Sequence, residues 1–136
     1  MKNHRIYRFI ICSIFIVTLG CTKKEEKEPL TGVSVFIPNT FTPNTSPRIN
    51  DNFMWVIDNP QNIPLTFSCV ITDNEGITVF KTTYLSEYWT GKMRVGNQNN
   101  KGKLLPQNTY SYKLVLSRPN SSQESVFKGI VFLNYF

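Results

Sequence analysis

The apolar residues of this chain come in short runs that mostly alternate with polar ones, and no window of ten or more residues has clean helical periodicity. The runs are rich in valine, isoleucine, threonine, phenylalanine and tyrosine, the residues that strands favour. They cover residues 33–37, 53–57, 65–72, 77–83, 109–117 and 125–133. Segments with turn residues separate them; one such turn is predicted at residues 73–76. This pattern excludes a helical fold.

The same runs indicate how the strands are arranged. In the run 109–117, Tyr110, Tyr112, Leu114 and Leu116 share one face, as in a strand with one buried side. Six or seven short strands with turns between them predict an all-β domain, an immunoglobulin-like antiparallel β-sandwich of about seven strands. A membrane β-barrel is the competing β fold, but it needs at least eight strands of ~10 alternating residues. The long polar interruption at 89–103 leaves no room for them.

Residues 1–20 have the composition of a leader. A basic start is followed by an apolar run of twelve residues, Phe9 to Gly20, which is too short to cross a ~30 Å hydrocarbon core as a helix. This is typical of a secretory signal peptide. Cys21 directly follows the small Gly20 and resembles the acylated cysteine of a lipoprotein, whose lipid chains would anchor the protein to a membrane. A plain signal peptide and an uncleaved anchor are the alternatives, because Thr18 stands where lipoprotein signals usually carry leucine.

Residues 21–30 comprise the predicted lipidated cysteine and a charged tether, TKKEEKEPL, too polar to bury much surface. The tether is either a simple spacer or an address, since lysines followed by acidic residues after Cys21 resemble the surface-export signal of Bacteroidota lipoproteins. Residues 31–136 form the predicted domain. We therefore expect a protein of the cell envelope, an outer-membrane lipoprotein that is either periplasmic or surface-exposed.

Charge and rare residues exclude several function classes. Removal of the leader, with Lys2, Arg5 and Arg8, lowers the net charge from +6 to +3, and the remaining basic residues are scattered, so nucleic acid is not an expected partner. The leader also carries His4, the only histidine, which leaves the mature chain without imidazole-based catalysis or metal binding. Cys69 lies in an apolar run and is expected to be a small buried hydrophobe without a disulfide partner.

Several short blocks of unusual composition follow one another along the predicted domain. They are IPNTFTPN at 37–44, IND at 49–51 with Phe53, DNEG at 73–76, WTG at 89–91, GKLLP at 102–106, TYSY at 109–112 and KGIV at 128–131. In content and order they resemble the gliding-motility-associated C-terminal domain of the Bacteroidota, the second kind of sorting domain (type B) of the type IX secretion system. The matching positions are Pro38, Asn39, Phe41, Pro43, Asn44, Asn50, Asp51, Phe53, Gly76, Trp89, Gly91, Tyr110, Tyr112, Lys128 and Gly129. The resemblance implies that the secretion machinery recognises the domain.

The residue types in these blocks point mainly to structural roles. The two prolines, Pro38 and Pro43, fix φ and lack an N–H, so they should end the first strand and direct the chain. Trp89 is expected to close one end of the sandwich. Tyr110 and Tyr112 are expected to fill the core with their hydroxyls near its edge.

The segment after Asn44 departs from the family pattern. The family has a loop that resembles a calcium site, whereas here Asp51 is the only carboxylate between residues 37 and 53, and Arg48 adds a positive charge. Calcium takes six to eight oxygen ligands, several of them usually anionic. We therefore expect turns here, with no metal, and predict neither cofactor nor catalytic residues.

Two functions remain open at this stage. In the first, the domain is a secretion address, as the resemblance implies, although only a short tether would precede it. In the second, it is a lipid-anchored, non-catalytic envelope module with a binding or accessory role, its partner another envelope protein or a secretion component. The departures in the loop and at Thr90 and Asn108 favour the second function, and on that basis a reporter fused to the domain should not be secreted.

Overall fold

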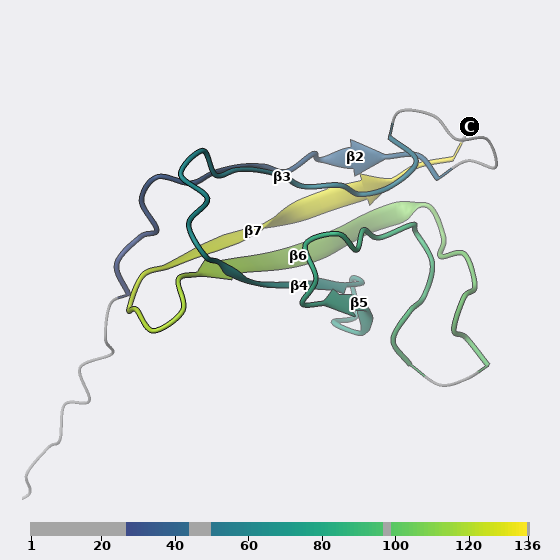
Figure 1. Ribbon diagram of the computed structural model, residues 1–136. Coiled ribbons are helices and arrows are strands. Elements are labelled where there is room, and N and C mark those ends of the chain that lie inside the picture. The colour runs from purple at the N-terminus through teal and green to yellow at the C-terminus, as the bar shows by residue number, and fades with distance from the viewer. Residues whose placement is uncertain (1–26, 44–49, 97–98, 136) are drawn as a thin grey trace, which may run out of the picture.

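The computed structural model describes residues 27–43, 50–96 and 99–135 (Figure 1). In these ranges the regular structure is entirely β. The strands are β1 (Ser34–Phe36), β2 (Thr40–Phe41), β3 (Val56–Asp58), β4 (Thr66–Thr72), β5 (Thr78–Thr82), β6 (Asn108–Ser117) and β7 (Glu124–Leu133). The all-β prediction is therefore confirmed, including the number of strands in the described part of the chain. No helix among the described residues is long and apolar enough to cross a membrane.

The strands form two sheets. One contains β1 and β3, and the other has the order β2-β7-β6-β4-β5. Figure 1 shows the long strands β6 and β7 side by side through the middle of the molecule, with the β2 and β3 segments along one side of them. The order β7-β6-β4-β5 corresponds to the G, F, C and C′ strands of a variable-type immunoglobulin sandwich. The predicted sandwich is thus the observed one.

Two details differ from the sequence-based expectation. Strand β2 was not among the predicted runs, and it pairs with β7 in parallel, whereas every other strand pair is antiparallel. The predicted run 53–57 begins three residues before β3, and Phe53 instead forms an isolated bridge with Trp89. The ladder between β1 and β3 ends at the pair Phe36 and Val56, just before Pro38, which cannot donate a ladder bond. The chain then passes to the other sheet, where β2 pairs with β7.

The core lies between the two sheets and is built on the inward side chains of the alternating strands. On β6, Tyr110, Leu114 and Leu116 are buried as the sequence predicted, whereas Tyr112 on the same face is only half-buried; on β7 the buried residues are Val131 and Leu133. All buried hydrophobic residues among those described lie between Leu30 and Leu133. A fragment of residues 27–136 thus keeps the entire described core and should fold by itself.

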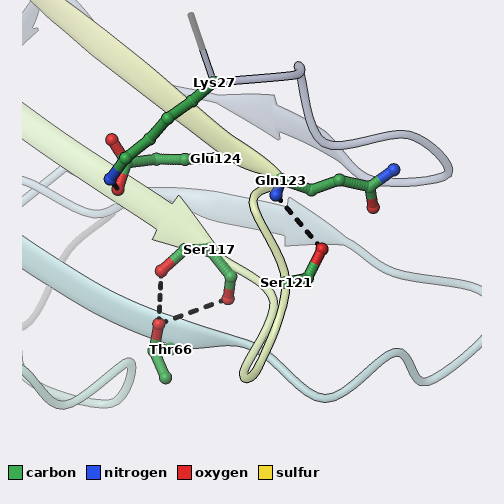
Figure 2. A network of polar contacts seen from close by, with 6 residues as sticks. All are labelled: Lys27, Thr66, Ser117, Ser121, Gln123 and Glu124. Carbon is green, nitrogen blue, oxygen red and sulfur yellow. Dashed lines mark hydrogen bonds and ion pairs between the residues drawn. The ribbon is translucent and has the colours of Figure 1, made fainter. Parts of the chain in front are cut away.

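Packing begins earlier than the predicted domain boundary at residue 31. Leu30 is only 8 % exposed, and its N–H donates to the Ser125 hydroxyl at 3.0 Å. Two residues before it, the Glu28 carbonyl accepts a bond from the Glu124 N–H at 2.9 Å. Figure 2 shows Lys27 reaching the Glu124 carboxylate, 2.8 Å away. The last four residues of the predicted tether, 27–30, therefore lie against the start of β7, while the predicted leader and Cys21 lie outside the described residues.

Candidate functional site

The aromatic residues of the family-type blocks meet around Trp89, which has no exposed surface. The Phe41 ring lies 5.1 Å from the Trp89 ring and the Tyr110 ring lies 4.9 Å from it, measured between centroids. The Trp89 indole N–H donates to the Lys92 carbonyl at 3.0 Å, so its one polar group is satisfied inside the domain. Three blocks that are far apart in the sequence thus meet in one packed cluster around Trp89.

Gly91 fits closely against the proline of the first block. Its φ is +73°, in the left-handed region that glycine adopts at little cost. A Cβ at this position would lie 2.8 Å from Pro43 Cγ and 3.0 Å from Leu133 Cδ1. The WTG block therefore needs glycine at this position for two reasons: the left-handed backbone conformation and the close approach of Pro43 and Leu133.

Gly129 has a different reason to be glycine. Its φ is not in the left-handed region, but it lies directly opposite Tyr112 in the β6–β7 register. A Cβ on Gly129 would come within 2.6 Å of the Tyr112 hydroxyl and 2.8 Å of Cζ, because the Tyr112 ring lies across the glycine. The Tyr112 ring also packs against the Phe53 ring, with 5.5 Å between the two centroids. The TYSY and KGIV blocks are therefore the two halves of one cross-strand contact.

Tyr110 makes the hydrogen bond known as a tyrosine corner. It stands near the start of β6, the F-type strand, and its hydroxyl donates to the Pro106 carbonyl four residues earlier, at 2.8 Å. Burial raises the pKa of Tyr110 to about 12, and Tyr135 and Asp73 add to this rise by charge repulsion. Tyr135, near the end of the chain, donates in the same region to the Leu105 carbonyl. Sequence patterns do not single out these carbonyl acceptors, because any residue can supply one.

In segment 37–53, the described residues on either side of the loop lie close together. The Thr42 N–H donates to the Asn50 carbonyl at 2.9 Å, which ties the two ends of the loop together. Asn50 has a φ of +77°, a conformation that asparagine tolerates better than most residues. Residue Asn39 uses its carbonyl to accept the Phe132 N–H of β7. Pro38 and Asp51 are half-buried, and Asn44, with the loop up to residue 49, lies outside the described residues.

The remaining two motif positions lie on the surface. Gly76 closes the turn at 73–76 with a φ of +80° and an N–H bond to the Asp73 carbonyl, and the Asp73 carboxylate accepts two further backbone N–H groups. The turn predicted from the sequence is confirmed. Lys128 stands exposed on the outer face of β7. The structure thus brings most matching residues into one packed network and leaves Lys128 as the exposed charge among them.

The described residues contain no group of three or more histidine, cysteine, aspartate or glutamate side chains placed to hold a metal. The predicted absence of calcium remains a prediction, because the altered loop falls outside the described ranges. Around Trp89, the polar groups of Trp89, Tyr110 and Tyr135 donate to backbone carbonyls.

Comparison with known proteins gives this network an identity. The family model described as CHU_C Type IX secretion signal domain matches residues 35–133, which span the sandwich from β1 to the end of β7. The chain belongs to this family. No curated protein and no solved structure matches the chain significantly. The resemblance noted in the sequence blocks is therefore confirmed, and as a type IX secretion signal domain the chain is associated with the cell envelope or surface. The match supports the secretion-address function, which the departures from the family pattern had made the less favoured of the two.

Cys69 provides a test of the packing next to this network. The thiol is fully buried on β4, and burial raises its pKa to about 12. A thiol reacts as thiolate, so we expect no reaction of Cys69 with iodoacetamide at pH 8 in the folded fragment 27–136 and complete reaction in urea. Mass spectrometry after timed quenching measures the label. Rapid alkylation without denaturant would show that β4 is more accessible than the structure has it.

Proposed function

We propose that residues 27–136 act as a non-catalytic sorting signal that the type IX secretion machinery recognises in the folded state. The observation that carries the proposal is the family match across 35–133. Retention of the motif contacts supports it, since Gly91 still meets Pro43 and Gly129 still meets Tyr112 despite the changed loop. Because these contacts are internal, they would preserve a shape, and the machinery would read the exposed parts of that shape.

A reporter fusion tests this proposal. A signal peptide and a soluble reporter are placed before residues 27–136, with Cys21 omitted so that no lipid confounds the result. We expect the reporter in the medium or on the surface of cells with an intact type IX translocon and in the periplasm of translocon-deficient cells. This expectation reverses the one drawn from the loop departures alone, because the family match spans the sandwich and the structure shows the core of the motif network intact.

The controls separate recognition from folding. A fusion that ends before residue 27 should remain periplasmic in both strains. Protease resistance of the fused domain in periplasmic extracts reports whether it is folded. A folded, resistant fusion that stays in the periplasm of translocon-competent cells would contradict the proposal and favour an envelope module that is no longer sorted.

A second candidate function rests on Cys21. We propose that the mature chain is anchored by lipid at this cysteine and serves as an envelope module beside another envelope protein. The sequence signal at Gly20-Cys21 supports anchoring. Since the chain packs on β7 from Lys27 onward, the six steps from Cys21 to Lys27 could span at most about 20 Å. An anchored domain would therefore stay close to the membrane surface.

Loss of the thiol tests the anchor. We expect Cys21→Ser to move the protein from the membrane fraction to the soluble fraction, because a serine cannot receive the thioether-linked lipid that holds the chain in the bilayer. Immunoblotting of fractions after a high-salt wash measures the distribution, and Cys69→Ser serves as the matched control that should stay membrane-bound. Sedimentation of Cys21→Ser with membranes would refute lipid anchoring without bearing on sorting.

A further inference from the structure

Part of β7 is an open sheet edge. The N–H groups that point away from β6 belong to alternate residues: Glu124 donates to Glu28, Phe132 donates to Asn39, and Asn134 donates to Phe41. Between these bonds lie Val126, Lys128 and Ile130, whose N–H groups face the same way, and β2 is too short to reach them. Among the described residues, none forms a hydrogen bond with this stretch from that side.

The side chains along this open edge are exposed. Val126 is 44 % exposed and Ile130 is 62 % exposed, on the outer face of the sheet, and Lys128 stands between them. Free backbone groups with apolar side chains beside them are what an added strand needs, since main-chain bonds supply affinity and the side chains supply selectivity. The stretch from Val126 to Ile130 would accept a segment of about five residues.

The charge next to this edge is positive and uncompensated. Lys128 lies directly opposite Lys113 in the β6–β7 register, and the row continues through Val70 to Lys81 on β5. We refer to Lys81, Lys113 and Lys128 as the lysine row. On the outer face of β4, β6 and β7 the one acidic side chain is Glu124, which Lys27 already holds at 2.8 Å (Figure 2). Like charges placed opposite each other across strands are unfavourable, so a carboxylate placed beside Lys128 would relieve this pair.

The same lysine argues against a second copy as the occupant. Antiparallel pairing of two β7 edges centred on Lys128 would place the two lysines opposite each other. Lysine on an edge strand is also a common protection against self-association. The charge thus disfavours another β7 and favours a strand with an acidic residue at its centre.

We propose that the open edge of β7, from Val126 to Ile130, binds an extended acidic segment of a partner protein as an added strand. The partner strand hydrogen-bonds to the outward backbone groups of Val126, Lys128 and Ile130. A carboxylate on it lies beside Lys128, and β-branched or apolar residues on either side contact Val126 and Ile130. This interaction surface is independent of whether the secretion machinery reads the domain.

Two blocked seven-residue peptides test the proposal. Both alternate threonine and valine, with glutamate at the centre of one and lysine at the centre of the other, and each is titrated into ¹⁵N-labelled fragment 27–136. We expect the glutamate peptide to shift the amide signals of Val126, Lys128 and Ile130 and to slow their hydrogen exchange. We expect it to bind about fivefold more tightly than the lysine peptide. Equal affinity for both peptides, or shifts that spread over the lysine row without slower exchange at the edge, would overturn the proposal.

Three variants make the test specific. Lys128→Glu should reverse the preference, so that the lysine peptide binds more tightly. Lys81→Glu makes the same charge change in the same row but at the far edge of the sheet, and it should leave the preference in place. Val126→Pro removes an N–H that faces away from β6 and should abolish binding of both peptides while the spectrum stays folded. An equal response to Lys81→Glu and Lys128→Glu would overturn edge binding, as would binding to anionic lipid vesicles with no response to either peptide.

Discussion

Trp89→Ala should lower the free energy of unfolding of fragment 27–136 by about 4 kcal/mol, among the largest losses that a single substitution can cause in a domain of this size. The side chain is fully buried between Phe41 and Tyr110. Its removal leaves a cavity in a core that two sheets hold at fixed spacing, and it deprives the Lys92 carbonyl of its donor. Urea unfolding followed by far-ultraviolet circular dichroism measures the loss.

Two variants decide what this loss means. Trp89→Phe keeps most of the apolar volume but removes the indole N–H, so a loss of about 1–2 kcal/mol is expected. Trp55, which is also buried and donates to the Leu85 carbonyl, lies outside the family-type blocks, and Trp55→Ala should cost about as much as Trp89→Ala. A cost below about 1 kcal/mol for Trp89→Ala would show that the packing of this side chain contributes little to the stability of the domain.

The fold prediction rested mainly on the alternation of apolar and polar residues. It was correct where the observed strand pairing follows that alternation. Strands β4 to β7 lie where the pattern placed them, and Tyr110, Leu114 and Leu116 are buried on one face of β6. The run 53–57 shows the limit of this signal. Phe53 and Trp55 are buried and Met54 is exposed, as in a strand, yet regular pairing starts only at Val56, since a partner strand and not the run itself determines where the ladder begins.

Strand β2 could not be predicted, because two residues are too few to show an alternating pattern and because its partner strand, β7, lies at the other end of the sequence. Leu30 was assigned to a solvated tether for a related reason: the residues before it are charged, and composition averages over a segment whereas burial depends on a single side chain. The pairs Gly91–Pro43 and Gly129–Tyr112 are closer to being predictable. The blocks that contain them were visible in the sequence, but a glycine motif shows only that space or a special φ is needed, and the register of the sheet shows which neighbour requires it.

Gly91→Ala is expected to cost about 3 kcal/mol, the sum of a strained left-handed backbone and an overpacked contact. The added Cβ would meet Pro43 Cγ at 2.8 Å and Leu133 Cδ1 at 3.0 Å, and neither neighbour can withdraw easily. The pyrrolidine ring has no free rotor, and Leu133 is fully buried next to the short pairing of β2 with β7. Urea unfolding measures the cost.

Gly76→Ala isolates the contribution of the backbone. Gly76 has a φ of +80°, close to the +73° of Gly91, but a Cβ there would find no atom within 4 Å, so its cost should be about 1 kcal/mol. The difference between the two substitutions is then the cost of the steric contact. In a Pro43→Ala background, which removes the Cγ atom, Gly91→Ala should lower the stability by less than it does in the native chain. The effects of substitutions at two groups in direct contact are not additive. Equal costs for Gly76→Ala and Gly91→Ala would mean that the IPNTFTPN and WTG blocks do not touch, and that Pro43 is not part of the packed network around Trp89.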